Sequence, residues 1–335
     1  MGQKEALYWK RIKEDIVQCQ LCPHFCFLKE DEMGKCGVRQ NKEGILRSLS
    51  YEKPCSIAVD PIEKKPLYHF LPSQKTLSIA TPGCNLKCKF CQNWEISQAK
   101  IEEYKIKEVS PEEIINEAIK NKCKIISYTY TEPTVFYEYM IDIAKKAKKR
   151  GIKNVIVSNG FINPEPLNEL CRFIDGANID LKSINPKFYL ELCGADLKPV
   201  INTIKTLIKN KVWTEVTTLI IPGKNDSEEE IKKLSKLIKS IDCNIPLHFS
   251  AFYPCYQMMN VKRTSAKILN KAREVAIKEG LRYVYTGNII DEKGSATYCL
   301  KCKKGLIKRE GFDVVENKLN NGFCSCGEKI AGVWG

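Results

Sequence analysis

The sequence has no apolar run long enough to cross a membrane. Its longest apolar stretches, such as 216–222, are far shorter than the roughly 20 residues of a transmembrane helix. The N-terminal residues mix charges and lack the apolar core of a secretory signal peptide. Gly2 is not followed by the Ser or Thr that N-myristoylation requires. We therefore expect a cytoplasmic protein without a membrane partner.

Acidic residues are in the minority. Asp and Glu number 40 against 54 Lys and Arg, so the formal net charge is +14. Such a surplus suits a nucleic-acid surface or an acidic protein partner, and the charge alone does not choose between them. The densest basic run, 145–150, ends a predicted helix, where cations suit the C-terminal dipole. A solvated helix end explains that run.

Cysteine is abundant, and its count of 17 is odd, which excludes complete intramolecular pairing. In a chain without a secretion signal, enrichment in cysteine points to metal or redox chemistry. The cysteines are grouped: four lie in 19–36, three in 84–91 and four in 299–326. The others are scattered, which is typical of small buried hydrophobic residues.

The chain divides into three regions, 1–75, 76–287 and 288–335. In the first, we predict a short amphipathic helix over 8–17, a strand over 45–51 and a non-helical connection over 60–66 that packs on another element. The last region is short and rich in cysteine.

The middle region, 76–287, alternates about seven predicted strands with helices, which favours parallel strands joined by helical crossovers. One helix begins after Ser110 as N-cap, and another after Asp226. The alternation fits an incomplete barrel or an open doubly wound sheet. In both folds, ligands gather at the carboxyl ends of the strands.

The first strand of this region leads into Cys84-Asn-Leu-Lys-Cys88-Lys-Phe-Cys91. Three thiolates at this spacing can converge on one cluster. A [4Fe–4S] cluster normally takes four thiolates, so three leave one iron open for an exchangeable ligand. The alternative is a structural zinc site that takes a distant fourth ligand.

This loop resembles the CxxxCxxC motif of radical S-adenosylmethionine (SAM) enzymes, including the aromatic Phe90. The continuation Gln92-Asn93-Trp94, the segment Asp60-Pro-Ile-Glu-Lys-Lys-Pro-Leu-Tyr-His69 and the N-terminal Cys-x-x-Cys-Pro pattern are similar to the radical SAM enzymes of the AmmeMemoRadiSam system, relatives of pyruvate formate-lyase activating enzyme. The resemblance implies an α/β fold, a partial (β/α)6-type barrel over 76–287. It also implies a [4Fe–4S] cluster at Cys84, Cys88 and Cys91 and reductive cleavage of SAM to a 5′-deoxyadenosyl radical, which abstracts hydrogen from a C–H bond.

The same resemblance assigns SAM contacts to polar residues at strand ends. Thr131 and Glu132 belong to a TEP motif, Ser158 and Asn159 to SNG, and Asp180 and Lys182 to DLK. Other interpretations stay open: an ordinary helix start, a plain turn and an Asp180–Lys182 salt bridge. The implied cofactor-binding residues are Phe90, Thr131, Glu132, Ser158, Asn159, Asp180, Lys182 and Thr217.

His248, on a predicted strand, is the best placed of the three histidines for substrate contact. The competing interpretation is a core histidine with its hydrogen bonds satisfied, which is the more frequent role of a lone histidine on a strand.

Two further cysteine sets flank the middle region. Cys19, Cys22, Cys26 and Cys36 suffice for one four-coordinate site, and zinc or an auxiliary Fe–S cluster would accept them equally. His24 is a substitute ligand or a plain loop residue. Cys299, Cys302, Cys324 and Cys326 are typical of a zinc ribbon, although the single residue between the last two departs from the CxxC pattern.

We thus expect a cytoplasmic radical SAM enzyme, an oxidoreductase or activase, that acts on a protein or peptide. The resemblance implies Memo-like and AMMECR-like protein partners, and the basic surplus suits acidic flavodoxin or ferredoxin electron donors. One rival is a radical SAM enzyme that modifies tRNA, which predicts nucleic-acid binding and steep salt dependence. The other is a zinc-binding scaffold without catalytic activity, which would have no need of the TEP, SNG and DLK motifs.

Overall fold

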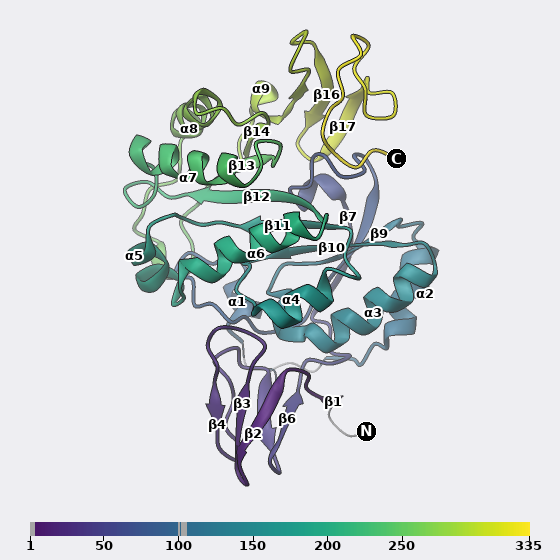
Figure 1. Cartoon of the computed structure of the whole chain (residues 1–335), viewed down its shortest axis with the longest axis vertical. Coiled ribbons are helices and arrows are strands. Elements are labelled where there is room, and N and C mark those ends of the chain that lie inside the picture. Colours follow the sequence, from purple (N-terminus) through teal and green to yellow (C-terminus); the bar gives the residue numbers. More distant parts are fainter. Residues whose placement is uncertain (1–3, 100, 102–105) are drawn as a thin grey trace.

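The computed structural model describes residues 4–99, 101 and 106–335, and its centre is an eight-stranded sheet (Figure 1). Its order is β14-β13-β12-β11-β10-β9-β8-β7; the strands from β8 onward pair in parallel, and β7 pairs antiparallel with β8. The strands are β7 (Ser56–Pro61), β8 (Lys75–Ala80), β9 (Ile125–Tyr128), β10 (Lys153–Ser158), β11 (Gly176–Asp180), β12 (Trp213–Ile220), β13 (Leu247–Ala251) and β14 (Val284–Gly287).

The strand order settles which of the two predicted folds is present. Each strand lies beside its neighbours in the chain, whereas a doubly wound sheet would reverse its order at a switch point. The sheet is therefore an incomplete barrel, with β7 and β14 at its two edges. The seven predicted strands all exist, and β7 adds an antiparallel edge from a segment predicted within the N-terminal region.

Helices connect successive strands, and Figure 1 shows α3, α4 and α6 in front of the sheet. Ser110 forms a capping box with Glu113 at the start of α2, as predicted. The prediction that Asp226 caps α7 was wrong: Ser227 is the N-cap, and its hydroxyl accepts from the N–H of Glu230 at 3.2 Å. The crossover helices are α2 (Pro111–Lys120), α3 (Tyr137–Lys149), α4 (Pro164–Leu170), α6 (Leu197–Lys209), α7 (Glu228–Ile241) and α8 (Ala266–Lys278).

Shorter helical segments lie between these elements, mostly at the ends of the barrel. They are the 3-10 turns η1 (Ile62–Lys64), η3 (Pro133–Phe136) and η5 (Tyr256–Met258), the π-helical η4 (Tyr189–Cys193), and the short helices α1 (Trp94–Ser97), α5 (Pro186–Phe188) and α9 (Glu292–Ser295). Among the described residues, no helix combines the length and apolarity needed to span a bilayer.

The N-terminal region consists of two small antiparallel sheets that extend from one side of the barrel (Figure 1). The predicted helix over 8–17 was wrong, because these residues form a hairpin. Val17 and Cys19 on β3 face the core while the paired strand β2 is largely exposed, so strand pairing overrides the helical spacing of the apolar residues. The strands are β1 (Lys4–Glu5), β2 (Trp9–Lys13), β3 (Ile16–Cys19), β4 (Phe27–Leu28), β5 (Arg39–Lys42) and β6 (Ile45–Ser48).

The connection after β7 closes the amino end of the barrel. Ile62, Leu67 and Phe70 pack with Ile125 and Val155, which lie on the first half of β9 and β10. The turn η1 within it is helical for three residues, whereas we predicted an extended or turned segment over 60–66. The prediction that this connection packs on another element is confirmed.

The C-terminal region is a three-stranded antiparallel sheet that also contacts the amino end. Its last residues bind the connection through backbone hydrogen bonds, from Val333 N–H to the His69 carbonyl at 2.7 Å and from Leu71 N–H to the Val333 carbonyl at 2.8 Å. The strands are β15 (Thr297–Tyr298), β16 (Gly305–Glu310) and β17 (Asp313–Asn317).

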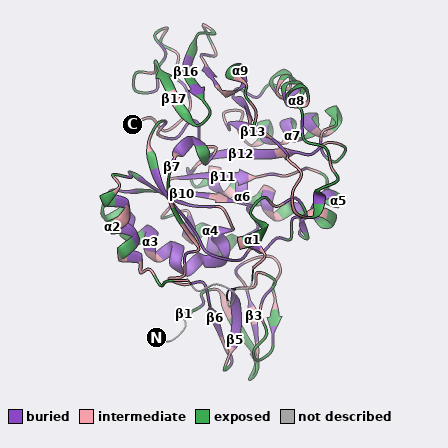
Figure 2. Cartoon of the chain, turned by 180° about the vertical axis from the view of Figure 1, so that it is seen from behind, coloured by how far each residue is buried: buried purple, intermediate pink, exposed green. Residues whose placement is uncertain are grey.

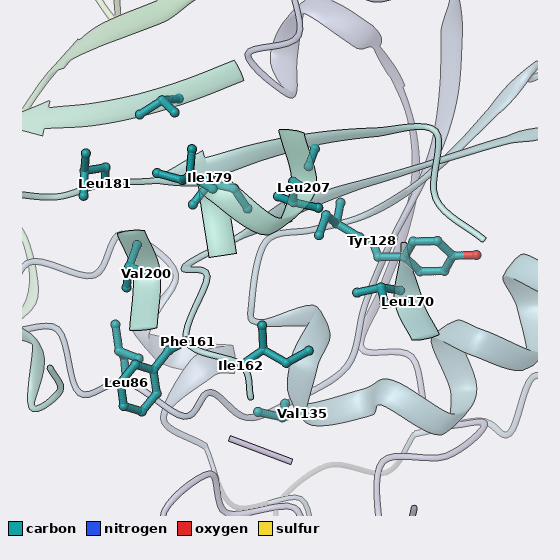
Figure 3. Packing of buried hydrophobic residues seen from close by; sticks show 14 of the residues in the cluster. Leu86, Tyr128, Val135, Phe161, Ile162, Leu170, Ile179, Leu181, Val200 and Leu207 are labelled. Atoms are coloured by element: carbon teal, nitrogen blue, oxygen red, sulfur yellow. The ribbon is translucent and has the colours of Figure 1, made fainter. Parts of the chain in front are cut away.

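One large apolar core joins the barrel to the N-terminal sheets, since Val17 and Val38 belong to the same buried cluster as the barrel residues. Buried residues line the sheet, whereas the C-terminal hairpin is mainly exposed (Figure 2). Figure 3 shows Leu86, from the three-cysteine loop, among the buried residues of this cluster, which include Phe161 and Val200 of α6. The loop is therefore anchored in the core by its own leucine.

Candidate active site

A cavity opens at the carboxyl ends of the barrel strands and contains most of the predicted site residues. All three cysteines of the loop line it, and so do side chains that follow β9, β10, β11 and β14. Its lining residues are Cys84, Leu86, Cys88, Phe90, Cys91, Gln92, Asn93, Ser97, Tyr130, Thr131, Glu132, Asn159, Asp180, Lys182, Thr217, Leu219, Ser250 and Asn288.

The three-cysteine loop is held by its backbone. Lys87 N–H donates to the Cys193 carbonyl at 2.8 Å and Lys89 N–H to the Leu192 carbonyl at 2.9 Å, so η4 acts as a template for the loop. Gly83 precedes the first cysteine with φ of +100°, and a Cβ there would lie 2.7 Å from Val38 Cγ1. Only glycine fits this close approach to the N-terminal region.

The three thiols lie in a polar but enclosed setting. The Sγ atom of Cys84 accepts from the Leu86 N–H at 3.4 Å, and that of Cys91 lies 3.3 Å from the Ser97 hydroxyl. Burial raises the pKa of Cys84 and Cys91, and the neighbouring Cys193 thiol together with burial raises that of Cys88. These thiols would ionise on binding a metal, whose charge offsets the cost of burial.

Glu132 connects two of the predicted motifs. Its Oε1 accepts from the Thr134 N–H at 3.0 Å and from the Ser158 hydroxyl at 2.8 Å, and its Oε2 accepts from the Asn159 N–H at 2.8 Å. Burial raises the pKa of this carboxyl. The carboxylate thus fixes the end of β10 against the end of β9, and it also lines the cavity.

Asn159 braces the cysteine loop with its side chain. Its Nδ2 donates to Asn85 Oδ1 at 2.9 Å and lies 3.7 Å from Cys84 Sγ, while its Oδ1 accepts from the Phe161 N–H at 2.8 Å. Both functions of the amide are therefore satisfied within the protein, although the residue lines the cavity.

Asp180 and Lys182 form a salt bridge, which was one of the alternatives considered from the sequence, with Lys182 Nζ 2.9 Å from Asp180 Oδ2. Burial opposes the charge on Lys182, but Asp180 and the nearby thiols of Cys88 and Cys193 raise its pKa well above the usual value. Both side chains line the cavity, so the pair places a fixed cation near the cysteine loop.

Thr217 is the one predicted contact whose polar atom has no partner in the protein. Its hydroxyl oxygen is buried, and the residue lines the cavity. Its neighbour Thr218 instead donates to the Leu181 carbonyl at 2.7 Å, because only one of two adjacent strand side chains can face inward. A buried hydroxyl without a partner in a cavity fits a polar ligand.

Comparisons with known proteins agree with this arrangement. Residues 78–238 match the family model of the radical SAM superfamily, and they contain the cysteine loop and the strand ends up to β12. A putative glycyl-radical enzyme activating enzyme of Methanocaldococcus jannaschii is 32% identical over 51% of this chain and 71% of its own. The chain belongs to the radical SAM superfamily.

Two further comparisons extend this result. An uncharacterised protein of the same organism is 43% identical over 98% of both chains. The solved structure of a radical SAM methyltransferase from Sphaerobacter thermophilus has a TM-score of 0.51, with 15% identity over 66% of this chain and 68% of that one. At that identity the structural likeness supports the fold alone.

The donor set fits the cofactors of a radical SAM protein. Cys84, Cys88 and Cys91 offer three thiolates from one loop, which would hold three irons of a [4Fe–4S] cluster and leave the fourth iron to SAM. The unpartnered hydroxyl of Thr217 and the charges of Asp180 and Lys182 face the same cavity, where a charged, polar molecule such as SAM would bind.

Two predicted residues lie outside this radical SAM cavity. The Ser158 hydroxyl bonds to Glu132 and supports it from behind. His248 is paired with Thr217 in register, but its ring points toward the amino end, with Nε2 2.6 Å from Glu215 Oε2. His248 is 5% exposed. It has the position of a satisfied core histidine, and no contact of His248 with the cavity supports a role in substrate binding.

The cavity of this radical SAM protein also contains residues outside the predicted set. Tyr130 has φ of +65°, and its hydroxyl bonds to Asp60 on β7. Asn288 follows β14 and donates to the Ser250 hydroxyl at 2.8 Å. Ser250 on β13 and Asn288 could have been found by their place at or near strand ends, whereas no local pattern marks Tyr130.

The C-terminal cysteines converge although the last two are separated by one residue. Cys299 and Cys326 sulfurs are 3.5 Å apart, and those of Cys302 and Cys324 are 3.6 Å apart. Tetrahedral zinc with Zn–S bonds of 2.3 Å places its sulfurs about 3.8 Å apart. The four ligand atoms lie within 4.8 Å of one another, so this set can hold a single metal ion.

Proposed function

We propose that the protein is a radical SAM enzyme of the activating-enzyme type that abstracts hydrogen from a C–H bond of a protein or peptide. The observation that carries this proposal is the single cavity that combines three cysteine thiols, the Asp180–Lys182 pair and the unpartnered Thr217 hydroxyl at the carboxyl ends of the strands. The likeness to a putative glycyl-radical enzyme activating enzyme supports a polypeptide substrate.

The reaction chemistry would come from the bound cofactors, since a reduced [4Fe–4S] cluster supplies the electron that splits SAM into methionine and a 5′-deoxyadenosyl radical. The chain supplies position and enclosure. Iron is bound by Cys84, Cys88 and Cys91. Polar contacts to SAM come from Asp180 and Thr217. The side chain of Phe90, which is 3% exposed, forms an apolar part of the cavity wall. Glu132 holds the ends of β9 and β10 together.

A second hollow next to the cavity indicates that the substrate is larger than the cavity itself. It lies between the end of β14 and the turn that joins β16 to β17, and Asn288 lines both spaces. Its wall includes the fully exposed Ile290 and the half-exposed Phe312, together with Tyr253. A polypeptide could lie on these apolar side chains and extend one residue toward the cavity.

The proposal extends to the system in which the enzyme works, its protein partners and its electron donor. The motifs around Asp60–His69 and Gln92–Trp94 support membership of the AmmeMemoRadiSam system, with Memo-like and AMMECR-like proteins as partners. The charge of +14 suits acidic flavodoxin or ferredoxin donors in the cytoplasm. We assign the four C-terminal cysteines to zinc, because their sulfur spacing fits one tetrahedral ion.

Anaerobic reconstitution with iron and sulfide, followed by reduction in the presence of SAM, tests the proposed function. We expect 5′-deoxyadenosine and methionine from the wild type and none from the Cys84→Ala/Cys88→Ala/Cys91→Ala variant. The matched control is Cys171→Ala, a half-buried thiol at the end of α4 that does not line the cavity.

A wild type that binds zinc at the loop and forms no 5′-deoxyadenosine would contradict enzymatic activity. Product formation that requires tRNA, with steep loss of binding at higher salt, would favour a tRNA-modifying enzyme instead. Product formation stimulated by an added candidate polypeptide, with deuterium transfer from that polypeptide to 5′-deoxyadenosine, would support the proposed substrate class.

A further inference from the structure

The four N-terminal cysteines face one small cavity behind the catalytic loop. Cys19, Cys22, Cys26 and Cys36 all line it, together with Arg39 and Asn85. The backbone of Gly34 passes beside two of the thiols. A Cβ added there would lie 3.6 Å from Cys36 Sγ and 3.8 Å from Cys26 Sγ. Residues from the β3–β4 loop and from the turn before β5 are thus brought together around a common centre.

Arg39 is an independent sign that this cavity receives an acceptor group. The side chain is 2% exposed, and its Nη2 is 3.0 Å from Glu138 Oε1. Its Nε and Nη1 atoms are buried and have no hydrogen-bond partner in the protein. Glu138 already supplies one negative charge, and its Oε2 is likewise buried without a partner, so Nε and Nη1 of Arg39 remain available as donors to an acceptor group bound in this cavity.

The three cysteine sets of the molecule differ in how closely their sulfur atoms lie together. Among the described residues, only the C-terminal four form a group of three or more ligand atoms that all lie within 4.8 Å of one another. The N-terminal four and the catalytic three are all described, and neither set contains three sulfurs that all lie within that distance of one another. In an Fe–S cluster each thiolate binds its own iron, so wider spacing is expected than around one zinc ion.

The N-terminal site adjoins the catalytic loop through a short polar connection. His24 Nε2 lies 2.7 Å from the Asn85 carbonyl oxygen, and Asn85 follows Cys84 directly. Asn85 is 1% exposed and lines the N-terminal cavity, while Cys84 lines the catalytic one. Gly83 also contacts the N-terminal region, since a Cβ there would lie 2.8 Å from the Cys36 carbonyl oxygen. Adjacent residues of one loop, Cys84 and Asn85, therefore line the two sites.

We propose that Cys19, Cys22, Cys26 and Cys36 bind a second [4Fe–4S] cluster, which passes electrons to the cluster at Cys84, Cys88 and Cys91. With four protein thiolates it has no open iron, which favours electron transfer over substrate binding. The step is a one-electron exchange: a reduced flavin or iron–sulfur protein is oxidised, the N-terminal cluster is reduced, and it then reduces the catalytic cluster. This role rests on the proposed function, whereas the presence of the cluster does not.

An exposed lysine lies beside the N-terminal site, where an electron donor could dock. Lys35 is exposed, and its Nζ lies 3.4 Å from His24 Nδ1, next to the polar connection. Electron entry here would keep the donor away from the open side of the barrel, where Ile290 and Phe312 lie. The donor and the polypeptide substrate could then bind at the same time.

Metal analysis of the reconstituted full-length protein tests the second cluster directly. We expect about eight iron, eight sulfide and one zinc per chain, since each [4Fe–4S] cluster carries four irons. The Cys22→Ser/Cys26→Ser variant should lose about half of the iron and keep the electron paramagnetic resonance signal that changes on addition of SAM. Cys171→Ser is the control and should keep all of the iron.

Iron counts distinguish failure of this inference from failure of the proposed function. About four irons with two zinc ions per wild-type chain would overturn the second cluster and leave the catalytic one intact. The Cys84→Ala/Cys88→Ala/Cys91→Ala variant should still bind about four irons per chain, and further substitution of the N-terminal cysteines should remove them. That result would support the second cluster even if the protein did not cleave SAM. The wild-type count needs no variant, so misfolding of a variant does not affect it.

The choice of reductant tests the relay. With a reduced flavodoxin, Cys22→Ser/Cys26→Ser should form 5′-deoxyadenosine about tenfold or more slowly than wild type, whereas with titanium(III) citrate the two rates should be similar. Equal rates with flavodoxin would overturn the relay. A comparable loss with both reductants would also overturn it, since it would indicate general damage to the catalytic site.

Discussion

Two residues of β12 show how differently the two ends of the barrel are built. Glu215 and Thr217 are two positions apart on one strand, so both side chains face the barrel interior. The Thr217 hydroxyl lines the cavity at the carboxyl end without a partner. Glu215 faces the amino end and has a partner for each oxygen. These partners are Tyr68 N–H at 3.0 Å, His69 N–H at 2.7 Å, the Trp213 indole at 3.0 Å and His248 Nε2 at 2.6 Å.

Within the single strand β12, one residue therefore stabilises the fold and another is available to bind a ligand. At the amino end, Glu215 fixes the connection after β7, which in turn binds the C-terminal tail through His69. At the carboxyl end, a polar atom is left free for a ligand. Barrel enzymes in general place chemistry at the carboxyl end and stability at the amino end. Variants at the two ends should therefore affect different measurements.

Removal of the Glu215 carboxylate should have the largest effect. Glu215→Ala would leave buried donors from three elements without an acceptor, and we expect a loss of about 3–5 kcal/mol in the free energy of unfolding. Urea unfolding of the metal-loaded protein measures this. Glu215→Gln, which keeps one acceptor oxygen, should lose less.

An equal and small loss for both Glu215 variants would contradict a stabilising role of this carboxylate. The protein that remains folded should bind SAM with unchanged affinity, since Glu215 does not line the cavity. A specific loss of SAM affinity without loss of stability would therefore break the comparison between the two ends.

The second prediction concerns pH and His69. Burial lowers the pKa of His69 from its usual 6.5 to about 4. As the pH falls from 6.5 to 4, the unfolded chain takes up a proton at this residue and the folded chain does not, so stability is lost on acidification. The difference corresponds to about 3 kcal/mol, complete near pH 4. His69→Gln should show a correspondingly shallower loss of unfolding free energy over this range; identical slopes would contradict the assignment.

The sequence predicted the barrel well, because its crossovers leave local marks. Ser110 with Pro111 and Glu113 marks the start of α2, and the same kind of mark recurs near the start of α7, one residue from the predicted place. The hairpin β2–β3 was missed because its burial depends on pairing with β4 and on contact with the barrel. Apolar spacing within 8–17 carries no information about those contacts.

The site was predictable wherever chemistry fixes the spacing along the chain. The cysteine loop is such a case. The resemblance to radical SAM enzymes, and not spacing, assigned Glu132, Asp180 and Thr217, and all three line the cavity. His248 shows the limit. Its ring is directed by Glu215, which lies 33 residues earlier in the chain, and no local pattern reveals that partner. The bond between Tyr130 and Asp60 depends on β7 in the same way.

Metal removal should separate the C-terminal module from the barrel. If one zinc ion holds Cys299, Cys302, Cys324 and Cys326, a mild chelator should expose β16 and β17 and leave the barrel folded, because the metal stabilises only the fold around it. We expect amide exchange in β16 to accelerate about tenfold or more, equivalent to about 1.4 kcal/mol, with β10–β12 unchanged. Uniform acceleration across the barrel would show instead that the module stabilises the whole amino end.

The smallest effect on stability, and the most specific effect on binding, is expected at Thr217. Thr217→Val removes a hydroxyl that has no partner in the protein, so the free energy of unfolding should stay the same or rise slightly. The affinity for SAM should fall by about 1 kcal/mol, the value of one hydrogen bond, or roughly five- to tenfold in Kd.

Thr218→Val is the matched control: the Thr218 hydroxyl bonds to the Leu181 carbonyl at 2.7 Å, so stability should fall by about 1 kcal/mol while SAM affinity is kept. Calorimetric titration with SAM and urea unfolding of both variants would measure the two effects. The reverse pattern would mean that the free hydroxyl of Thr217 serves the fold, and that the two ends of β12 do not divide binding from stability.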